Sequence, residues 1–174
     1  MKYHIILLLI ILSYRGVYSQ EKEYLVTNDN DTIYGKIIRG TNYLNPSKTI
    51  FKIKDKEGKK HLINPAEVKV LRSLKGVDGD CIIRTVYGTF FIKKIIHGRI
   101  NVFQMIDNVF YYTSKDNEKI KAADFGGFGS RKKAHAEIRT LIKDNPKILK
   151  EFDSLKGSAK NILYIIKKYN QFYY

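Results

Sequence analysis

Cysteine is nearly missing from this chain of 174 residues, which contains only Cys81. A single cysteine excludes an intramolecular disulfide, so the fold must be held by its hydrophobic core alone. Cys81 lies in the apolar run CIIRTVY. This setting predicts a buried, unreactive thiol.

Long hydrophobic runs are also missing, and the longest apolar stretch near the amino end is Ile5 to Leu12. A membrane-spanning helix needs about 20 apolar residues, so this run is too short to span a bilayer. Lys2 followed by a short apolar run is typical of a secretory signal. Small residues at Val17 and Ser19 predict cleavage between Ser19 and Gln20, which makes residues 1–19 the signal peptide. The alternative interpretation keeps the run as an N-terminal core strand.

Export would place the mature chain in the periplasm, at the outer membrane or outside the cell. No cysteine lies near the expected cleavage point, which argues against a lipid anchor. The sequence also predicts no transmembrane helix in the mature chain.

Acidic residues are scarce, with 17 Asp and Glu against 32 Lys and Arg, a net charge of +15. Removal of Lys2 and Arg15 with the signal leaves 30 basic and 17 acidic residues, or +13. Such an excess favours anionic partners such as nucleic acid, acidic glycans or lipid headgroups. Lysine outnumbers arginine 25 to 7, which argues against sequence-specific nucleic-acid binding, because such readers use the planar arginine fork. An AT-rich genome would also produce a lysine excess without any function.

Residues 20–123 alternate apolar and polar positions between turn signals. Thr49–Lys54, for example, places Phe51 and Ile53 on one face and two lysines on the other. About ten short strands of this kind predict an antiparallel meander that is curled into a sandwich or partial barrel.

Residues 131–174 change to helical spacing, with apolar residues at Ala134, Ile138 and Ile142. Asn145 and Ser158 are expected N-caps, and Gly157 is a helix stop. Three helices packed on the sheet make the predicted class α+β, with body and helices in one domain. The last helix is expected to bury a stripe formed by Ile162, Ile165, Ile166, Tyr169 and Tyr173.

The segment 124–130, DFGGFGS, is predicted to be a hinge between the body and the helices. A phosphate-binding P-loop requires G-x-x-x-x-G-K-[ST], but Gly129 is followed by Ser130 and Arg131. Three glycines permit unusual backbone angles, while Phe125 and Phe128 are expected to attach the segment to the core.

Other catalytic and metal patterns are incomplete. His135-Ala136-Glu137 matches the H-x-E of zinc deaminases, but the required P-C-x-x-C is absent. The acidic turn at Asp29 has neither the glycine nor the final glutamate of a calcium loop. We therefore predict no enzyme activity, no metal and no cofactor.

The stretches YLVTNDNDTIYGKI and TIFKIKDKEGKKHLINPAEVKVL resemble an uncharacterised family of small exported proteins from Gram-negative bacteria. The resemblance covers roughly residues 20–115 and extends to DNPKILKEF and KKYNQ in the helical tail. It implies export and a β-rich body, and it carries no site.

These observations predict an exported, non-catalytic protein of the cell envelope or exterior that works through surface contacts, with an envelope protein as one kind of partner. The alternative is a lysine-rich binder of an anionic polymer or membrane surface, such as lipopolysaccharide, an acidic glycan or nucleic acid. Residues 131–174 carry 11 basic and 4 acidic residues. The candidate contacts there are Lys132, Lys133, Arg139, Lys143, Lys147 and Lys150.

Overall fold

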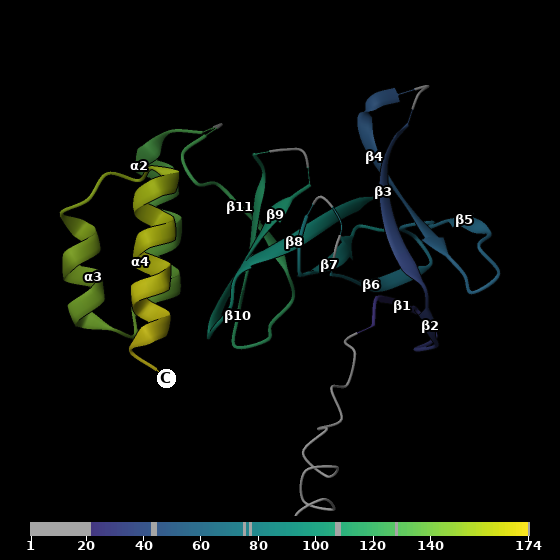
Figure 1. Ribbon diagram of the computed structural model, residues 1–174. Helices are drawn as coiled ribbons and strands as arrows, with labels where there is room; N and C mark the ends of the chain where they lie inside the picture. The colour runs from purple at the N-terminus through teal and green to yellow at the C-terminus, as the bar shows by residue number, and fades with distance from the viewer. Residues whose placement is uncertain are drawn as a thin grey trace, which may run out of the picture.

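The chain forms an α+β fold in which an antiparallel meander precedes three C-terminal helices, as the sequence predicts (Figure 1). This computed structural model describes residues 22–42, 45–74, 76, 78–106, 109–127 and 129–173. The predicted signal peptide and its cleavage point lie outside the described residues. The strands are β1 (Tyr24–Thr27), β2 (Thr32–Tyr34), β3 (Lys36–Asn42), β4 (Asn45–Lys54), β5 (Lys60–Leu62), β6 (Val68–Ser73), β7 (Cys81–Val86), β8 (Phe90–Ile96), β9 (Ile100–Met105), β10 (Tyr111–Lys115) and β11 (Lys121–Ala123).

Eight strands form the large sheet, in the order β11-β10-β9-β8-β7-β6-β1-β2. Strands β6 to β11 follow one another as a meander, whereas β1 joins the sheet by pairing with β6. Leu25 lies opposite Leu71, which lies opposite Ile83. All three are buried, because residues in register on neighbouring strands share one face of a sheet.

A small sheet of order β3-β4-β5 covers one end of this face. Ile37, Phe51 and Ile53 from the small sheet share a core with the apolar column of the large sheet. The rings of Phe51 and Phe91 meet edge to face, with their centroids 4.8 Å apart. The two sheets are open and pack as two layers here, so the arrangement is a sandwich and not a partial barrel.

The three helices are α2 (Arg131–Ile142), α3 (Pro146–Asp153) and α4 (Ala159–Gln171). Figure 1 shows them together at the end of the molecule away from β3 and β4, beside β9 to β11. Their buried side chains share a core with Ile96, Ile100 and Val102 of the large sheet. We call these helices, together with the connections between them, the helical unit.

The expected helix caps are present. The side chain of Asn145 accepts a hydrogen bond from the Ile148 amide at 3.1 Å, and that of Ser158 accepts one from Asn161 at 3.5 Å. Helix α3 ends at Asp153, before the predicted stop at Gly157, with Ser154 as its C-cap. The predicted apolar stripe of α4 is buried as far as Tyr169, but Tyr173 is 44% exposed, because the helix ends at Gln171 and its periodicity stops there.

The small sheet and the helical unit cover the same face of the large sheet. Phe91 and Lys93 are two residues apart in β8, and Lys93 lies opposite Gln104, which is two residues from Val102 in β9. All four therefore point to one face. Phe91 belongs to the core under the small sheet, and Val102 to the core under the helices.

A polar strip separates these two cores. The Asp78 carboxylate, whose side chain is only 6% exposed, lies 2.8 Å from the Arg39 guanidinium and 3.5 Å from the Lys93 ammonium. With Gln104 these side chains line a cleft of about 360 Å³. The two apolar cores thus meet at charged groups and not at a continuous hydrophobic layer.

Candidate functional site

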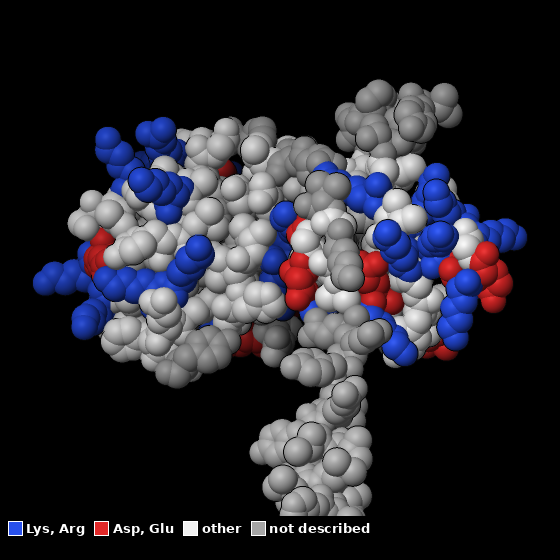
Figure 2. Space-filling view, in the orientation of Figure 1, with Lys and Arg blue, Asp and Glu red and all other residues white. Residues whose placement is uncertain are grey.

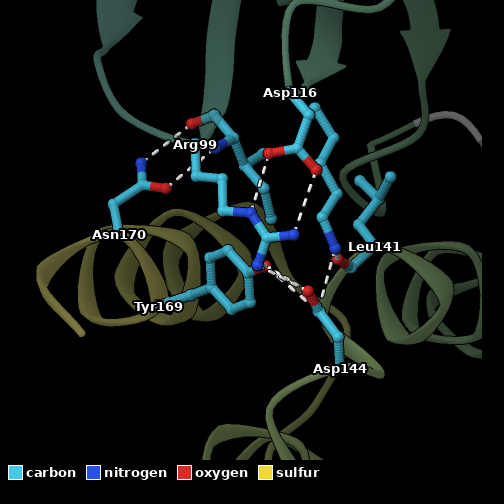
Figure 3. A network of polar contacts seen from close by, with 8 residues as sticks. Arg99, Asp116, Leu141, Asp144, Tyr169 and Asn170 are labelled. Atoms are coloured by element: carbon cyan, nitrogen blue, oxygen red, sulfur yellow. Dashed lines mark hydrogen bonds and ion pairs between the residues drawn. The ribbon is translucent and has the colours of Figure 1, made fainter. Parts of the chain in front are cut away.

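A polar network joins the helical unit to the large sheet (Figure 3). Arg99, in the β8–β9 turn, donates to Asp144 at 2.6 Å and to the Tyr169 hydroxyl at 2.9 Å. The Tyr169 hydroxyl in turn donates to Asp144 at 2.9 Å. Arg99 also pairs through two nitrogens with Asp116, at 2.7 and 3.1 Å. The network therefore ties together two turns of the sheet, the α2–α3 connection and α4.

The network contains the most strongly shifted titratable groups. Burial alone would raise the pKa of the Asp144 carboxyl, but hydrogen bonds from Lys115 and Tyr169 outweigh it and lower that pKa to about 2. Burial and the adjacent Asp144 raise the pKa of Tyr169. The hydrogen bond to Asp116 raises the pKa of Arg99. Each of these groups binds other members of the network, so the pKa shifts follow from contacts that hold the fold together.

A second contact fastens α4 to the same turn. The Asn170 side chain accepts from the Ile100 amide at 2.9 Å and donates to the Ile100 carbonyl at 2.8 Å and the His97 carbonyl at 3.1 Å. These are the bonds that another strand would make to Ile100. Gly98 has a φ of +149°, and a Cβ there would overlap Asn170. Only glycine lets the turn approach the helix this closely.

The Gly-rich segment connects β11 to α2. The Phe125 side chain is buried and stacks on Tyr111, with ring centroids 4.4 Å apart. Gly126 has a φ of +78°, and a Cβ there would fall on the carbonyl oxygen of Gly157. Ser130 caps α2 by accepting from the Lys133 amide at 3.1 Å. The segment thus allows two backbones to cross, while Phe128 lies outside the described residues.

Three histidines within the described residues make separate local contacts. His135 stacks on Phe152, with centroids 4.2 Å apart, and its Nε2 lies 2.9 Å from the Phe152 carbonyl oxygen. His61 pairs with Asp55 at 2.8 Å. Burial lowers the pKa of His97. Among the residues that the structure describes, no group of three His, Cys, Asp or Glu side chains could hold a metal ion.

Cys81 is half-buried in β7. Burial, reinforced by the nearby Asp78 carboxylate, raises the pKa of its thiol. A raised pKa leaves less thiolate, which is the nucleophilic form. The thiol is therefore less buried than the sequence predicts, while its raised pKa fits the predicted low reactivity.

Charge is distributed unevenly over the helical unit. Three of its four acidic side chains are held by cations: Asp144 by Arg99 and Lys115, Glu151 by Lys168, and Asp153 by Arg139. The other cations of the unit are exposed and form no ion pair with any acid of the described residues: Arg131, Lys132, Lys133, Lys143, Lys147, Lys150, Lys156, Lys160 and Lys167. Figure 2 shows mostly blue side chains projecting from the helical end, with little red among them, while blue and red lie side by side at the other end.

The predicted contact residues belong to two helices and the connection between them. Lys132 and Lys133 lie in the first turn of α2 and Lys143 at its end, while Lys147 and Lys150 lie on α3. Arg139 differs from the rest, because two of its nitrogens bind Asp153 at 2.6 and 2.8 Å. Its charge is therefore compensated.

Sequence reasoning missed further cations of the same unit. Arg131 and Lys156 are two of these, and with the predicted Lys132 they line one shallow groove of about 450 Å³ beside Gly157. Lys160 and Lys167 project from α4. The four-residue spacing of Lys156 and Lys160, and the place of Lys167 opposite the apolar stripe, are signals that could have identified them.

Two other clefts are lined largely by residues of the strands and their connections, and Lys133 and Ala159 of the helical unit also line the first of them. The cleft beside edge strand β11, about 630 Å³, is mostly apolar and has the exposed Val109 and Phe110 at its rim. The other, about 760 Å³, lies between the β2–β3 and β4–β5 connections. Its walls mix both signs of charge, with Lys22 and Glu23 among them.

Comparison of the chain with protein-family models, curated proteins and solved structures finds no match. In the part of the chain that the structure describes, no helix is both long and apolar enough to cross a membrane.

Proposed function

We propose that this is an exported, non-catalytic protein of the cell envelope or exterior, which binds an anionic polymer or surface through its helical unit. The observation that carries the proposal is the pairing of three of the unit's four acidic side chains with other cations, which leaves nine exposed cations of the unit without an ion pair among the described residues. Such a surface attracts polyanions from a distance and releases counterions when it binds them.

The sequence supplies the support for export, since Lys2 and the apolar run to Leu12 have the form of a secretory signal. The non-catalytic part rests on the polar network, where Arg99, Asp144 and Tyr169 use their contacts to hold the fold. N-terminal sequencing of the protein from its own cell should begin at Gln20. A product that begins at Met1 would contradict export.

Binding is tested by retention on immobilised lipopolysaccharide in a salt gradient, compared between two triple variants of equal charge. Lys132→Gln, Lys143→Gln and Lys150→Gln remove three cations from the helices. Lys56→Gln, Lys59→Gln and Lys60→Gln remove three exposed cations around the β4–β5 turn.

We expect the helical variant to elute at clearly lower salt than the wild type, and the turn variant to elute close to it. If both variants shift equally, net charge and not the helical unit determines binding. If the wild type shows no salt-sensitive retention on lipopolysaccharide or on duplex DNA, the anion-binding function is wrong.

A protein partner at the cleft beside β11 is the second candidate. Val109 and Phe110 are 58% and 42% exposed at its rim, and an edge strand can accept a further strand. Cross-linking in the native cell from a photoreactive residue at position 110 should yield one discrete adduct. The same residue at position 87, where Tyr87 is 65% exposed, is the control.

A further inference from the structure

Exposed aromatic rings and lysines alternate along one side of the helical unit. We call this surface the α3–α4 face and define it by Lys147, Lys160, Tyr164, Lys167, Lys168 and Phe172. Lys160, Tyr164, Lys168 and Phe172 follow one another at intervals of four residues. Side chains with this spacing lie above one another on the surface of a helix.

The aromatic members of the face are unusually exposed for their size. Tyr164 is 48% exposed and Phe172 is 54% exposed, whereas Ile165, Ile166 and Tyr169 on the opposite side of α4 are fully buried. Neither exposed ring contributes to a core of the described residues. Phe172 has no polar atom in its side chain, so water offers it no hydrogen bond.

A lysine lies over each of these rings. The Lys147 Nζ is 5.6 Å from the Phe172 ring centroid, and the Lys168 Nζ is 5.7 Å from that of Tyr164. One acidic side chain, Glu151, accepts from Lys168 at 2.6 Å and from the Tyr164 hydroxyl at 2.8 Å. The four defining lysines against this one carboxylate leave the face with a net charge of +3.

From this arrangement we infer that the α3–α4 face docks on a bilayer that contains anionic lipids. The inference rests on the proposed function and names its target. Lysine ammonium groups contact the lipid phosphates, while Tyr164 and Phe172 enter the headgroup layer, where aromatic rings are favoured. The face uses lysine throughout, and a compact ammonium acts on a phosphate as a point charge.

A single-stranded nucleic acid fits this face less well. Such a ligand binds by stacking its bases on open aromatic faces. Here one side of each ring is already occupied by a lysine. The side of each ring that faces away from its lysine is suited to shallow insertion between lipid headgroups.

The first test is co-sedimentation with vesicles of equal parts phosphatidylglycerol and phosphatidylcholine, and with phosphatidylcholine alone. Tyr164→Ser with Phe172→Ser removes the aromatic pair of the face. Tyr87→Ser with Phe90→Ser is the matched control, since these side chains are 65% and 43% exposed on the β-body. All variants share the same amino end, so any contribution from residues 1–19 cancels.

We expect the wild type and the control to bind the anionic vesicles alike, and the face variant to bind them at least about tenfold more weakly. None of the three proteins should bind strongly to vesicles of phosphatidylcholine alone. Equal binding of the face variant, or equal binding to both vesicle types, overturns the inference. Salt-sensitive retention on DNA or lipopolysaccharide in that case leaves the proposed function standing, with a polymer as its target.

A second measurement does not depend on the stability of the serine variants. The chain contains no tryptophan, so Phe172→Trp provides a single fluorescent reporter on the face. Its emission should shift to the blue with anionic vesicles, while Tyr87→Trp should not respond. An unchanged emission of Phe172→Trp in the presence of bound vesicles would falsify docking through this face.

Discussion

The helical unit and the small sheet cover two ends of the same sheet face, but they do so differently. Under the helices the core is complete, and Phe152, Ile138 and Ile165 are fully buried. At the other end, Leu62 of β5 is 66% exposed and Tyr34 of β2 is 54% exposed. The core under the helices contains more side chains with no exposed surface than the core under the small sheet.

The pairing of surface charges also differs between the two ends. At the small-sheet end, acidic and basic side chains remain mixed on the surface, as in the pair of His61 with Asp55. At the helical end three of the four acidic side chains form ion pairs, and most of the exposed lysines have no acidic partner. A well-packed core allows a surface to carry uncompensated charge, because burial of apolar area can offset the repulsion. This end is the one that can be specialised for binding.

The largest expected effect comes from removing one buried ring at each end. Phe152→Ala and Phe51→Ala each delete a side chain that is at most 1% exposed, and each should reduce the free energy of unfolding by about 3–5 kcal/mol. Strand β8 contributes Phe91 to one core and Ile96 to the other, so we expect a single transition. Urea unfolding, followed by far-ultraviolet circular dichroism and by tyrosine fluorescence, measures the loss of free energy and shows whether there is one transition. Separate midpoints in Phe152→Ala would show that the two ends unfold independently.

A smaller effect should distinguish two neighbouring glycines of the Gly-rich segment. Gly126→Ala would place a methyl group on the Gly157 carbonyl oxygen at a positive φ, and should cost roughly 1–3 kcal/mol of stability. Gly127 has open space around it and no positive φ. Gly127→Ala should therefore change the free energy of unfolding by less than about 1 kcal/mol. Equal losses in thermal unfolding would contradict the backbone crossing.

Acid should weaken the helical end through Asp144. The folded pKa of Asp144, about 2, lies below its ordinary value of 3.8, so the carboxylate stabilises the fold above pH 4 and loses this contribution as pH falls towards 2. Its side chain is 34% exposed, so solvent screening reduces the contribution to about 1 kcal/mol. Asp144→Asn should flatten the stability profile between pH 5 and 2. The exposed Asp29→Asn is the control, and a flattening of the same size there would remove Asp144 as the cause.

The smallest effect is expected at Arg139, whose side chain is 47% exposed in its pair with Asp153. Arg139→Gln should lower the free energy of unfolding only slightly, and less again at high salt, because the pair with Asp153 is exposed to solvent. Because Asp153 compensates its charge, Arg139→Gln should also change lipopolysaccharide retention less than Lys143→Gln does. The reverse order in a salt gradient would mean that Arg139 leaves Asp153 to bind the polymer.

Local features of the fold could be predicted from the sequence because they depend on neighbouring residues. The caps at Asn145 and Ser158, the core side of α2 and the anchoring of Phe125 follow from helical spacing and side-chain chemistry. Alternation likewise identified the strands. These signals act over one or two turns of chain.

Features that join distant segments could not be predicted in the same way. Strand β1 pairs with β6 across more than forty residues, and no local pattern specifies that register. Arg99, Asp144 and Tyr169 look like ordinary surface residues until the fold brings them together. Arg139 was counted as a contact residue because its partner Asp153 lies on another helix.

The polar strip between the two cores has a consequence for how uniquely the chain folds. On a continuous apolar face, the small sheet and the helical unit could each shift along the large sheet with little change in energy. The Asp78 carboxylate prevents this, because it must contact both Arg39 and Lys93. Buried ion pairs often add little stability yet can fix one alignment over its competitors. Replacement of the three by apolar residues of similar volume should therefore raise the melting temperature while broadening the amide resonances of β3 and β8, the mark of a protein that has become more stable and less well defined.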